Sequence, residues 1–168
     1  MRKLIFILPI VTVLLYACSN KQTKQQASVN GHFNEQRNLV FPQGNKITNA
    51  HFIGAAYLQM LINADSLNDI SIGNVTFEPG ARTNWHIHPA GQIILATEGV
   101  GYYQERGQPK KVLHKGDRIK CPPNVPHWHG ASKDSAFVQL AISSGAKGPA
   151  IWLEPVTDQQ HEGTLLNE

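Results

Sequence analysis

The sequence predicts an all-β fold, a β-sandwich or barrel, and three observations support this. Short apolar segments recur at spacings of roughly eight to twelve residues, with turn residues between them. The chain of 168 residues contains 14 glycines and 10 prolines, as a protein with many turns requires. No segment shows the apolar spacing of a helix over a useful length. The length corresponds to one domain, and a hydrophobic content of 41% is enough for a core.

The first expected strand covers residues 52–62, which are apolar with some alternation. Ala, Leu and Met in this segment also favour a helix, but Gly54 and the turn residues that follow favour a strand. The segments 101–104 and 111–114 flank Gly107 and predict a hairpin. The other expected strands cover residues 70–77, 82–88, 92–97, 117–121, 128–131, 135–142 and 151–155.

Residues 1–17 have the pattern of a signal peptide. Arg2 and Lys3 precede an apolar segment, residues 4–15, that is too short to span a bilayer comfortably. This segment leads into Leu-Tyr-Ala-Cys18, which resembles a bacterial lipobox, where the cysteine is lipidated and becomes the first mature residue. We therefore expect a lipid anchor at Cys18 and a cell-envelope lipoprotein, periplasmic or anchored in the outer membrane. The alternative is an ordinary signal peptide or an uncleaved anchor.

Residues 18–38 are polar and rich in Gln, Asn and Lys, which predicts a flexible tether before a folded domain at 39–160. The net charge of +3 falls to about +1 without Arg2 and Lys3. The basic residues are scattered and lack interleaved aromatics, which argues against a nucleic-acid partner. If Cys18 carries lipid, Cys121 has no partner for an intrachain disulfide, and we expect it to be a small buried hydrophobe.

Two short motifs contain the residues that indicate chemistry. In residues 80–92, His86 and His88 are two positions apart, so both face the same side of a strand, and Gln92 follows four residues later. His127 comes about 35 residues after Gln92, and His129 shares its face if the strand is regular. Neutral imidazoles with an oxygen donor are ligands for divalent metals. The pattern predicts one metal site.

These motifs resemble those of the cupin superfamily, whose fold is a double-stranded β-helix, a jelly-roll barrel. The resemblance covers residues 70–143. The first cupin motif is matched by Gly80, His86, His88, Gln92 and Gly99. The second is matched by Gly116, Pro122, Asn124 and His127. Asn124 stands where the motif has a turn glycine, and asparagine is the residue after glycine that best tolerates a positive φ.

Residues 75–92, 127–131 and 152–158 are also similar to a group of small cupins. The group includes bacterial manganese-dependent hydroxynitrile lyases and cupins associated with carboxymuconolactone decarboxylases. In the lyases three histidines and one glutamine hold the metal, and this set carries over to His86, His88, Gln92 and His127. The resemblance implies one divalent metal, Mn(II) first, with Fe(II), Zn(II) or Ni(II) as other candidates. It also implies a homodimer, because small cupins commonly pair.

Two features of the predicted site bear on its chemistry. A neutral Gln92 leaves the site formally +2, which makes the metal a stronger Lewis acid. It also argues against an Fe(II) dioxygenase, for which three histidines and a glutamate are the commoner set. In the lyases a further histidine faces the pocket from the strand after the second motif, and the aligned residue here is Gln139. An amide cannot act as a general base, which leaves His129 as the candidate for that role.

The sequence therefore predicts a lipid-anchored, metal-binding cupin that acts as a metal-assisted lyase, decarboxylase or isomerase. The expected substrate is a small oxygenated or carbonyl compound. The alternative is a cupin that binds or senses a small ligand at the cell envelope without turnover. The metal-ligand set favours the enzyme, and the replacement at Gln139 favours the binding protein.

The lipobox yields a direct prediction. Replacement Cys18→Ser should abolish incorporation of a labelled fatty acid, because the acceptor thiol is lost, while Cys121→Ser should leave labelling unchanged. The measurement is fluorography of the immunoprecipitated protein after metabolic labelling in a bacterial host. Labelling that survives Cys18→Ser would show that the lipobox interpretation is wrong.

Overall fold

The computed structural model describes residues 39–163, which lie within a compact unit, Arg37–Glu168. The predicted signal peptide and tether, including Cys18, lie outside the described residues. Within the described range, no helix is long and apolar enough to cross a membrane.

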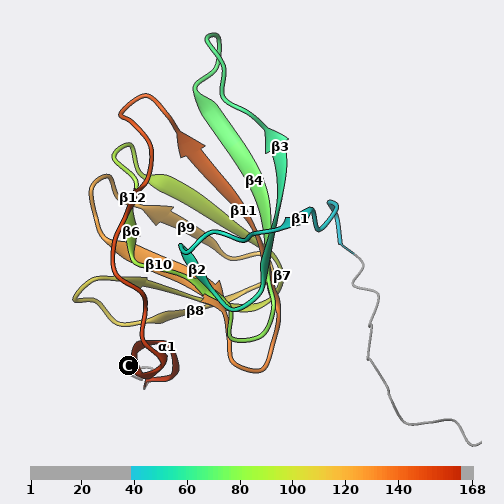
Figure 1. Ribbon diagram of the computed structural model, residues 1–168, viewed down its shortest axis with the longest axis vertical. Helices are drawn as coiled ribbons and strands as arrows, with labels where there is room; N and C mark the ends of the chain where they lie inside the picture. Colours follow the sequence, from blue (N-terminus) through green and yellow to red (C-terminus); the bar gives the residue numbers. More distant parts are fainter. Residues whose placement is uncertain (1–38, 164–168) are drawn as a thin grey trace, which may run out of the picture. The chain divides into compact units, whose positions relative to one another are not determined.

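Antiparallel strands make up almost all of the regular structure, which confirms the all-β prediction (Figure 1). The strands are β1 (Asn45–Lys46), β2 (Phe52–Ile53), β3 (Ala56–Ile62), β4 (Ile70–Phe77), β5 (Arg82–Thr83), β6 (His86–Ile87), β7 (Gln92–Glu105), β8 (Lys111–His114), β9 (Arg118–Cys121), β10 (His127–Ala131), β11 (Phe137–Ser144) and β12 (Ile151–Trp152). One short helix, α1 (Asp158–Glu162), follows the last strand.

The long strand β7 joins two groups of strands. Its first part pairs with β9 and β11, and β11 continues the sheet through β4 to β3 and β1. Its second part pairs with β8 and β10, and β10 pairs in turn with β5 and β6. Gly99 lies between the two parts with φ 73°, and a Cβ there would lie 1.9 Å from the Ala136 carbonyl oxygen. Only glycine permits this close approach, which lets β7 pair with both groups of strands.

The main core lies between the two groups of strands. Its largest fully buried side chains are Phe77, Ile94, Tyr103 and Phe137. Cys121 belongs to this core as a free thiol, and burial raises its pKa to about 12, which agrees with the predicted buried hydrophobe.

A second cluster is formed by Trp85, Trp128 and Val156, with Leu153 packed against it. The segment after β12 contributes to this cluster and is held there by Arg82. The Arg82 guanidinium donates to the Val156 carbonyl at 2.9 Å and to Asp158 at 2.6 Å. Trp85 and Trp128 are both almost fully buried in this cluster.

The structure differs from the predicted strands at four places. The expected strand 52–62 breaks at Gly54, which has φ 78°, so that β2 pairs with β5 and β3 pairs with β4. The expected strand 82–88 is two short strands, β5 and β6, whereas 92–97 and 101–104 form the single strand β7. The expected strand 151–155 is shortened to β12, and α1 follows it.

Helix α1 has a capping box that the sequence analysis overlooked. The Thr157 hydroxyl accepts from the Gln160 amide, and the Gln160 side chain accepts from the Thr157 amide. The pattern Thr-x-x-Gln is the signal that would have indicated a helix start.

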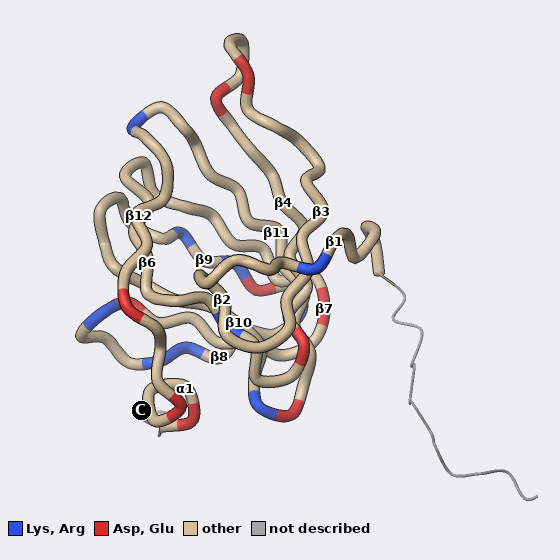
Figure 2. Tube along the Cα trace, in the orientation of Figure 1, with Lys and Arg blue, Asp and Glu red and all other residues tan. Residues whose placement is uncertain are grey.

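Charged residues of both signs are distributed along the described chain, in loops and in strands (Figure 2). Asp65 and Asp69 lie in the loop between β3 and β4, and Arg118 and Lys120 lie on β9.

The turn at Asn124 supports the metal-site region and yields a stability prediction. Asn124 has φ 62°, as expected for the residue that replaces the motif glycine, and its amide donates to the His88 carbonyl at 3.1 Å. Asn124→Ala should lower the free energy of unfolding by about 1 kcal/mol, because alanine lacks the short polar side chain with which asparagine tolerates the left-handed conformation. Asn124→Gly should be nearly neutral or slightly stabilising. Urea denaturation of both variants tests this, and equal stability of the two would contradict it.

Candidate metal centre

Four strands bring the predicted site residues to one end of the core. His86 begins β6 and is the Cα partner of His127, which begins β10. His129 lies two residues further along β10, and alternation turns its side chain to the same face as that of His127. Gln92 begins β7, and Gln139 lies on β11. All five of these side chains are buried.

Three histidines form a cluster of potential ligands. Each of His86, His127 and His129 offers a ring nitrogen, and these atoms lie within 4.8 Å of one another. The cluster can hold a metal ion. His88 lies beside it, with its ring centroid 5.2 Å from that of His86 and 5.8 Å from that of His127. The predicted ligands His86, His88, Gln92 and His127 therefore lie close together, with His129 as an additional neighbour. That these four residues bind a metal stays a prediction.

Backbone carbonyls fix the tautomers of two of these histidines. The Nδ1 atom of His86 lies 3.0 Å from the Asn84 carbonyl, and that of His127 lies 2.9 Å from the Val125 carbonyl. A carbonyl oxygen only accepts, so Nδ1 carries the proton in both rings and Nε2 keeps its lone pair. This arrangement orients a histidine for metal binding through Nε2.

The contact between His127 and Gln92 tests whether a cation fits. The Nε2 atom of His127 lies 3.4 Å from the Gln92 side-chain oxygen, while the Gln92 amide nitrogen donates to Ser143 at 3.4 Å. With the proton of His127 on Nδ1, two lone pairs face each other across this contact. A bound cation removes that repulsion, so the residues present fit a divalent metal.

Burial keeps the histidines neutral. It lowers the pKa of His86 and His129 well below the ordinary value, and it lowers that of His127. Burial and the neighbouring His127 lower the pKa of His88 to about 4. Imidazoles that are neutral at pH 7 are available as metal ligands without first releasing a proton.

His129 forms a buried pair with Gln139. The Gln139 amide nitrogen lies 3.1 Å from His129 Nδ1, whereas His129 Nε2 and the Gln139 oxygen have no hydrogen-bond partner among the described residues. When the amide donates to Nδ1, the His129 proton sits on Nε2 and faces the other histidines. When the amide is turned over, its oxygen accepts from Nδ1–H and Nε2 becomes a base. Gln139 thus supports both tautomers of His129.

An aromatic wall beside the cluster was not foreseen. Trp152 is the Cα partner of His86 on the neighbouring strand β12, and their ring centroids are 4.9 Å apart. His51 stacks on Trp152 with centroids 4.5 Å apart and an interplanar angle of 3°. The sequence placed a strand at 151–155 but contained no signal for its partner, because the pairing joins segments more than sixty residues apart.

The fold and the histidine cluster together define a small β-barrel-like protein with residues that could hold a metal ion. Comparison with known proteins gives its family. Residues 73–143 match the family model described as "Cupin domain". The chain is 40% identical over 111 residues to (R)-mandelonitrile lyase of Granulicella tundricola, which covers 66% of this chain and 85% of that protein. The chain belongs to the cupin superfamily.

Solved structures agree with this assignment. A cupin-like protein of Thermotoga maritima is 42% identical, with a TM-score of 0.73, over 77% of this chain and 99% of that chain. A cupin 2 conserved barrel domain protein of Rhodopseudomonas palustris has a TM-score of 0.57 at 18% identity, over 68% of this chain and 77% of that chain. The second likeness concerns the fold alone.

Single substitutions should identify the ligands. His86→Ala, His88→Ala, Gln92→Ala and His127→Ala should each lower metal affinity by at least about tenfold, since even residues outside the ligand shell commonly contribute that much. His129→Ala should retain metal. The measurement is metal content by elemental analysis after dialysis, with circular dichroism to confirm folding. A larger loss in His129→Ala than in His88→Ala would show that His129 takes the place of His88 as the third ligand.

Proposed function

We propose that this protein is a metal-assisted lyase that cleaves a small hydroxylated compound to a carbonyl product, with a hydroxynitrile as the first substrate to test. The observation that carries the proposal is the buried histidine cluster with Gln92, in which two lone pairs face each other where a cation would be held. The 40% identity to a protein named (R)-mandelonitrile lyase supports the same reaction class. A bound divalent metal, Mn(II) first, would supply a Lewis acid for the substrate oxygen.

The proposed roles of this chain's residues follow from their positions. His86 and His127 present Nε2 lone pairs, and Gln92 presents its amide oxygen beside His127. His129 is the buried imidazole whose proton can sit on Nε2 or leave it, depending on how Gln139 is turned. Trp152 and His51 stack beside His86 and offer an apolar aromatic surface to a substrate side chain. His129 is thus proposed to move the proton, with Gln139 positioning it.

A second candidate function is ligand binding without turnover, and Gln139 favours it. A lyase of this kind must accept a proton from the substrate hydroxyl, and an amide cannot do so near neutral pH. Burial holds the His129 pKa well below its ordinary value, which makes this imidazole a weak base. A cupin with these residues would bind a small oxygenated ligand at the cell envelope and release it unchanged.

The setting of the protein is also a proposal. We place it in the cell envelope, held to a membrane by lipid on Cys18, with the folded domain at the end of the tether. A homodimer is proposed because small cupins commonly pair. Light scattering on a soluble form that begins near Gln36 tests this, and a monomer independent of concentration would contradict it.

Exchange of Gln139 tests the enzymatic proposal. Wild type should cleave mandelonitrile slowly, because the proton acceptor is weak. Gln139→His should increase the rate by about 10²–10⁴-fold, the range that general-base catalysis contributes. The assay follows benzaldehyde by absorbance in protein loaded with Mn(II), and enantiomer analysis reports stereochemistry.

Two matched variants complete the test. Gln139→Asn retains an amide and should not gain activity, and His86→Ala should remove activity from the Gln139→His background. A fast wild type that Gln139→His leaves unchanged would show that His129 is already an effective base and that no proton acceptor is missing. No cleavage by any variant that retains metal would overturn the lyase proposal and support the binding protein.

A further inference from the structure

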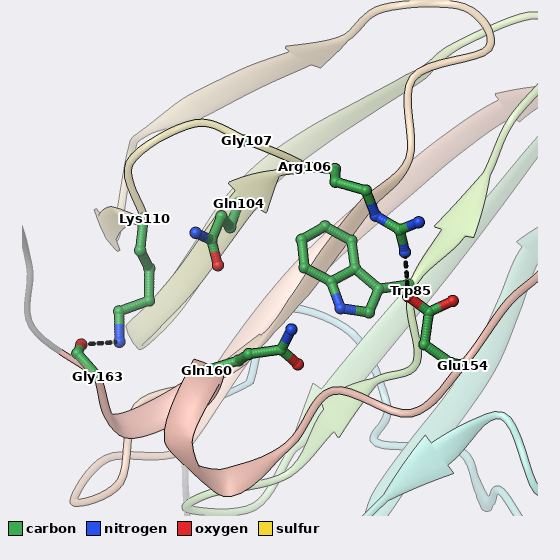
Figure 3. A pocket seen from close by; sticks show the side chains of 8 residues that line it. All are labelled: Trp85, Gln104, Arg106, Gly107, Lys110, Glu154, Gln160 and Gly163. Atoms are coloured by element: carbon green, nitrogen blue, oxygen red, sulfur yellow. Dashed lines mark hydrogen bonds and ion pairs between the residues drawn. The ribbon is translucent and has the colours of Figure 1, made fainter.

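A cavity of about 570 Å³ lies between the β7–β8 turn and helix α1, and no histidine is among its lining residues (Figure 3). Its volume falls within the range of small-molecule sites, roughly 300–1,000 Å³. The lining residues are Trp85, Gln104, Arg106, Gly107, Lys110, Glu154, Gln160 and Gly163. None of them belongs to the proposed metal centre, and nothing in the proposed function uses this cavity.

The cavity and the histidine cluster lie on opposite faces of the same strands. Trp85 immediately precedes His86, and Trp85 packs with Trp128 and Val156 in the second hydrophobic cluster, called the outer cluster below. His86 instead lies 4.4 Å from His127, centroid to centroid, on the inner face. A ligand in the cavity therefore cannot reach the metal-binding atoms, and the cavity is a separate site.

The walls of the cavity offer more hydrogen-bond donors than acceptors. Trp85 is 4% exposed, and its indole nitrogen has no partner among the described residues. The Gln160 oxygen accepts from the Thr157 amide, so its remaining polar atom is the amide nitrogen, which Figure 3 shows turned toward Trp85. Lys110 donates to the carbonyls of His161 and Gly163, which leaves one of its three N–H groups. A ligand rich in acceptors matches these walls.

Arg106 and Glu154 form an exposed ion pair at the edge of the cavity. The Arg106 guanidinium also lies over the Trp85 ring, 4.9 Å from its centroid. Glu154 is the only carboxylate among the lining residues, and Arg106 already engages it. Because exposed ion pairs contribute little stability, a ligand carboxylate can replace Glu154 at the guanidinium at small cost.

We propose that this cavity binds a small organic carboxylate, which accepts hydrogen bonds from Trp85, Gln160 and Arg106. The carboxylate competes with Glu154 for the guanidinium, and the ligand's apolar body packs against the indole edge and the aliphatic stems of Arg106 and Lys110. Glu154 therefore lowers the affinity for the carboxylate, because the ligand must displace it from Arg106. Arg106 raises that affinity, so the two members of one ion pair have opposite effects on binding.

The indole N–H of Trp85 provides a direct readout. The full-length protein loaded with metal is labelled with ¹⁵N, and the indole signals of its three tryptophans are recorded while benzoate is added. Trp85→Phe identifies the Trp85 signal, because the variant lacks this indole N–H. Benzoate should shift that signal with saturation. Inorganic phosphate is a probe that lacks a carboxylate. Acetate is a probe that has a carboxylate but lacks an apolar body.

Three charge variants decide the outcome. Arg106→Gln should weaken benzoate binding at least tenfold, and Glu154→Gln should strengthen it severalfold. Arg118→Gln, on β9, should change nothing. The proposal is overturned if no carboxylate shifts the Trp85 signal, if phosphate binds as tightly as benzoate, or if Glu154→Gln binds no better than wild type. If Arg106→Gln fails to fold, Glu154→Gln still tests the proposal, because it should strengthen benzoate binding.

Discussion

The pairing of β6 with β10 is the contact on which the candidate site depends. It sets His86 opposite His127 and so joins two motifs that are about forty residues apart in the chain. The carbonyls of Asn84 and Val125, each two residues before its histidine, then hold both rings in the same tautomer. The strand pairing and these two hydrogen bonds thus direct the Nε2 lone pairs of both histidines toward the same region. The side-chain oxygen of Gln92, at the start of β7, adds a third donor there.

The same pairing explains why the inner and outer faces differ in chemistry. Residues alternate across β10, so His127 and His129 face the core while Trp128 faces outward. The indole of Trp128 donates to Gln104 at 2.9 Å, which fixes one wall of the outer cavity. A substitution that shifted β10 by one residue would exchange imidazoles for indole at the metal centre and destroy both sites together.

Local spacing was enough to predict much of this molecule. The two histidine motifs and the turn at Asn124 specify short-range geometry. The structure pairs His86 with His127 and gives Asn124 the positive φ that its motif position predicts, whereas the strand ends before His88. The break at Gly54 and the division of 82–88 into two strands were missed, because strand continuity depends on which partner each residue meets across the sheet. The contact of Trp152 with His86 depends on tertiary pairing in the same way. The family resemblance indicated that Gln139 faces the pocket, but no local pattern indicated that its amide would pair with His129.

Strand β12 and the residues after it serve two surfaces at once. Trp152 lies against His86 on the inner face, whereas Leu153 and Val156 join the outer cluster and Glu154 borders the outer cavity. These residues lie beyond position 143, where the match to the cupin family model ends. The part of the chain that builds the two candidate sites is therefore longer than the segment matched by the family model. A protein trimmed to that segment would retain the histidine motifs but lose the aromatic wall beside the histidines and three of the residues that line the outer cavity, Glu154, Gln160 and Gly163. Chains that share only the matched segment with this one need not share its ligand preferences.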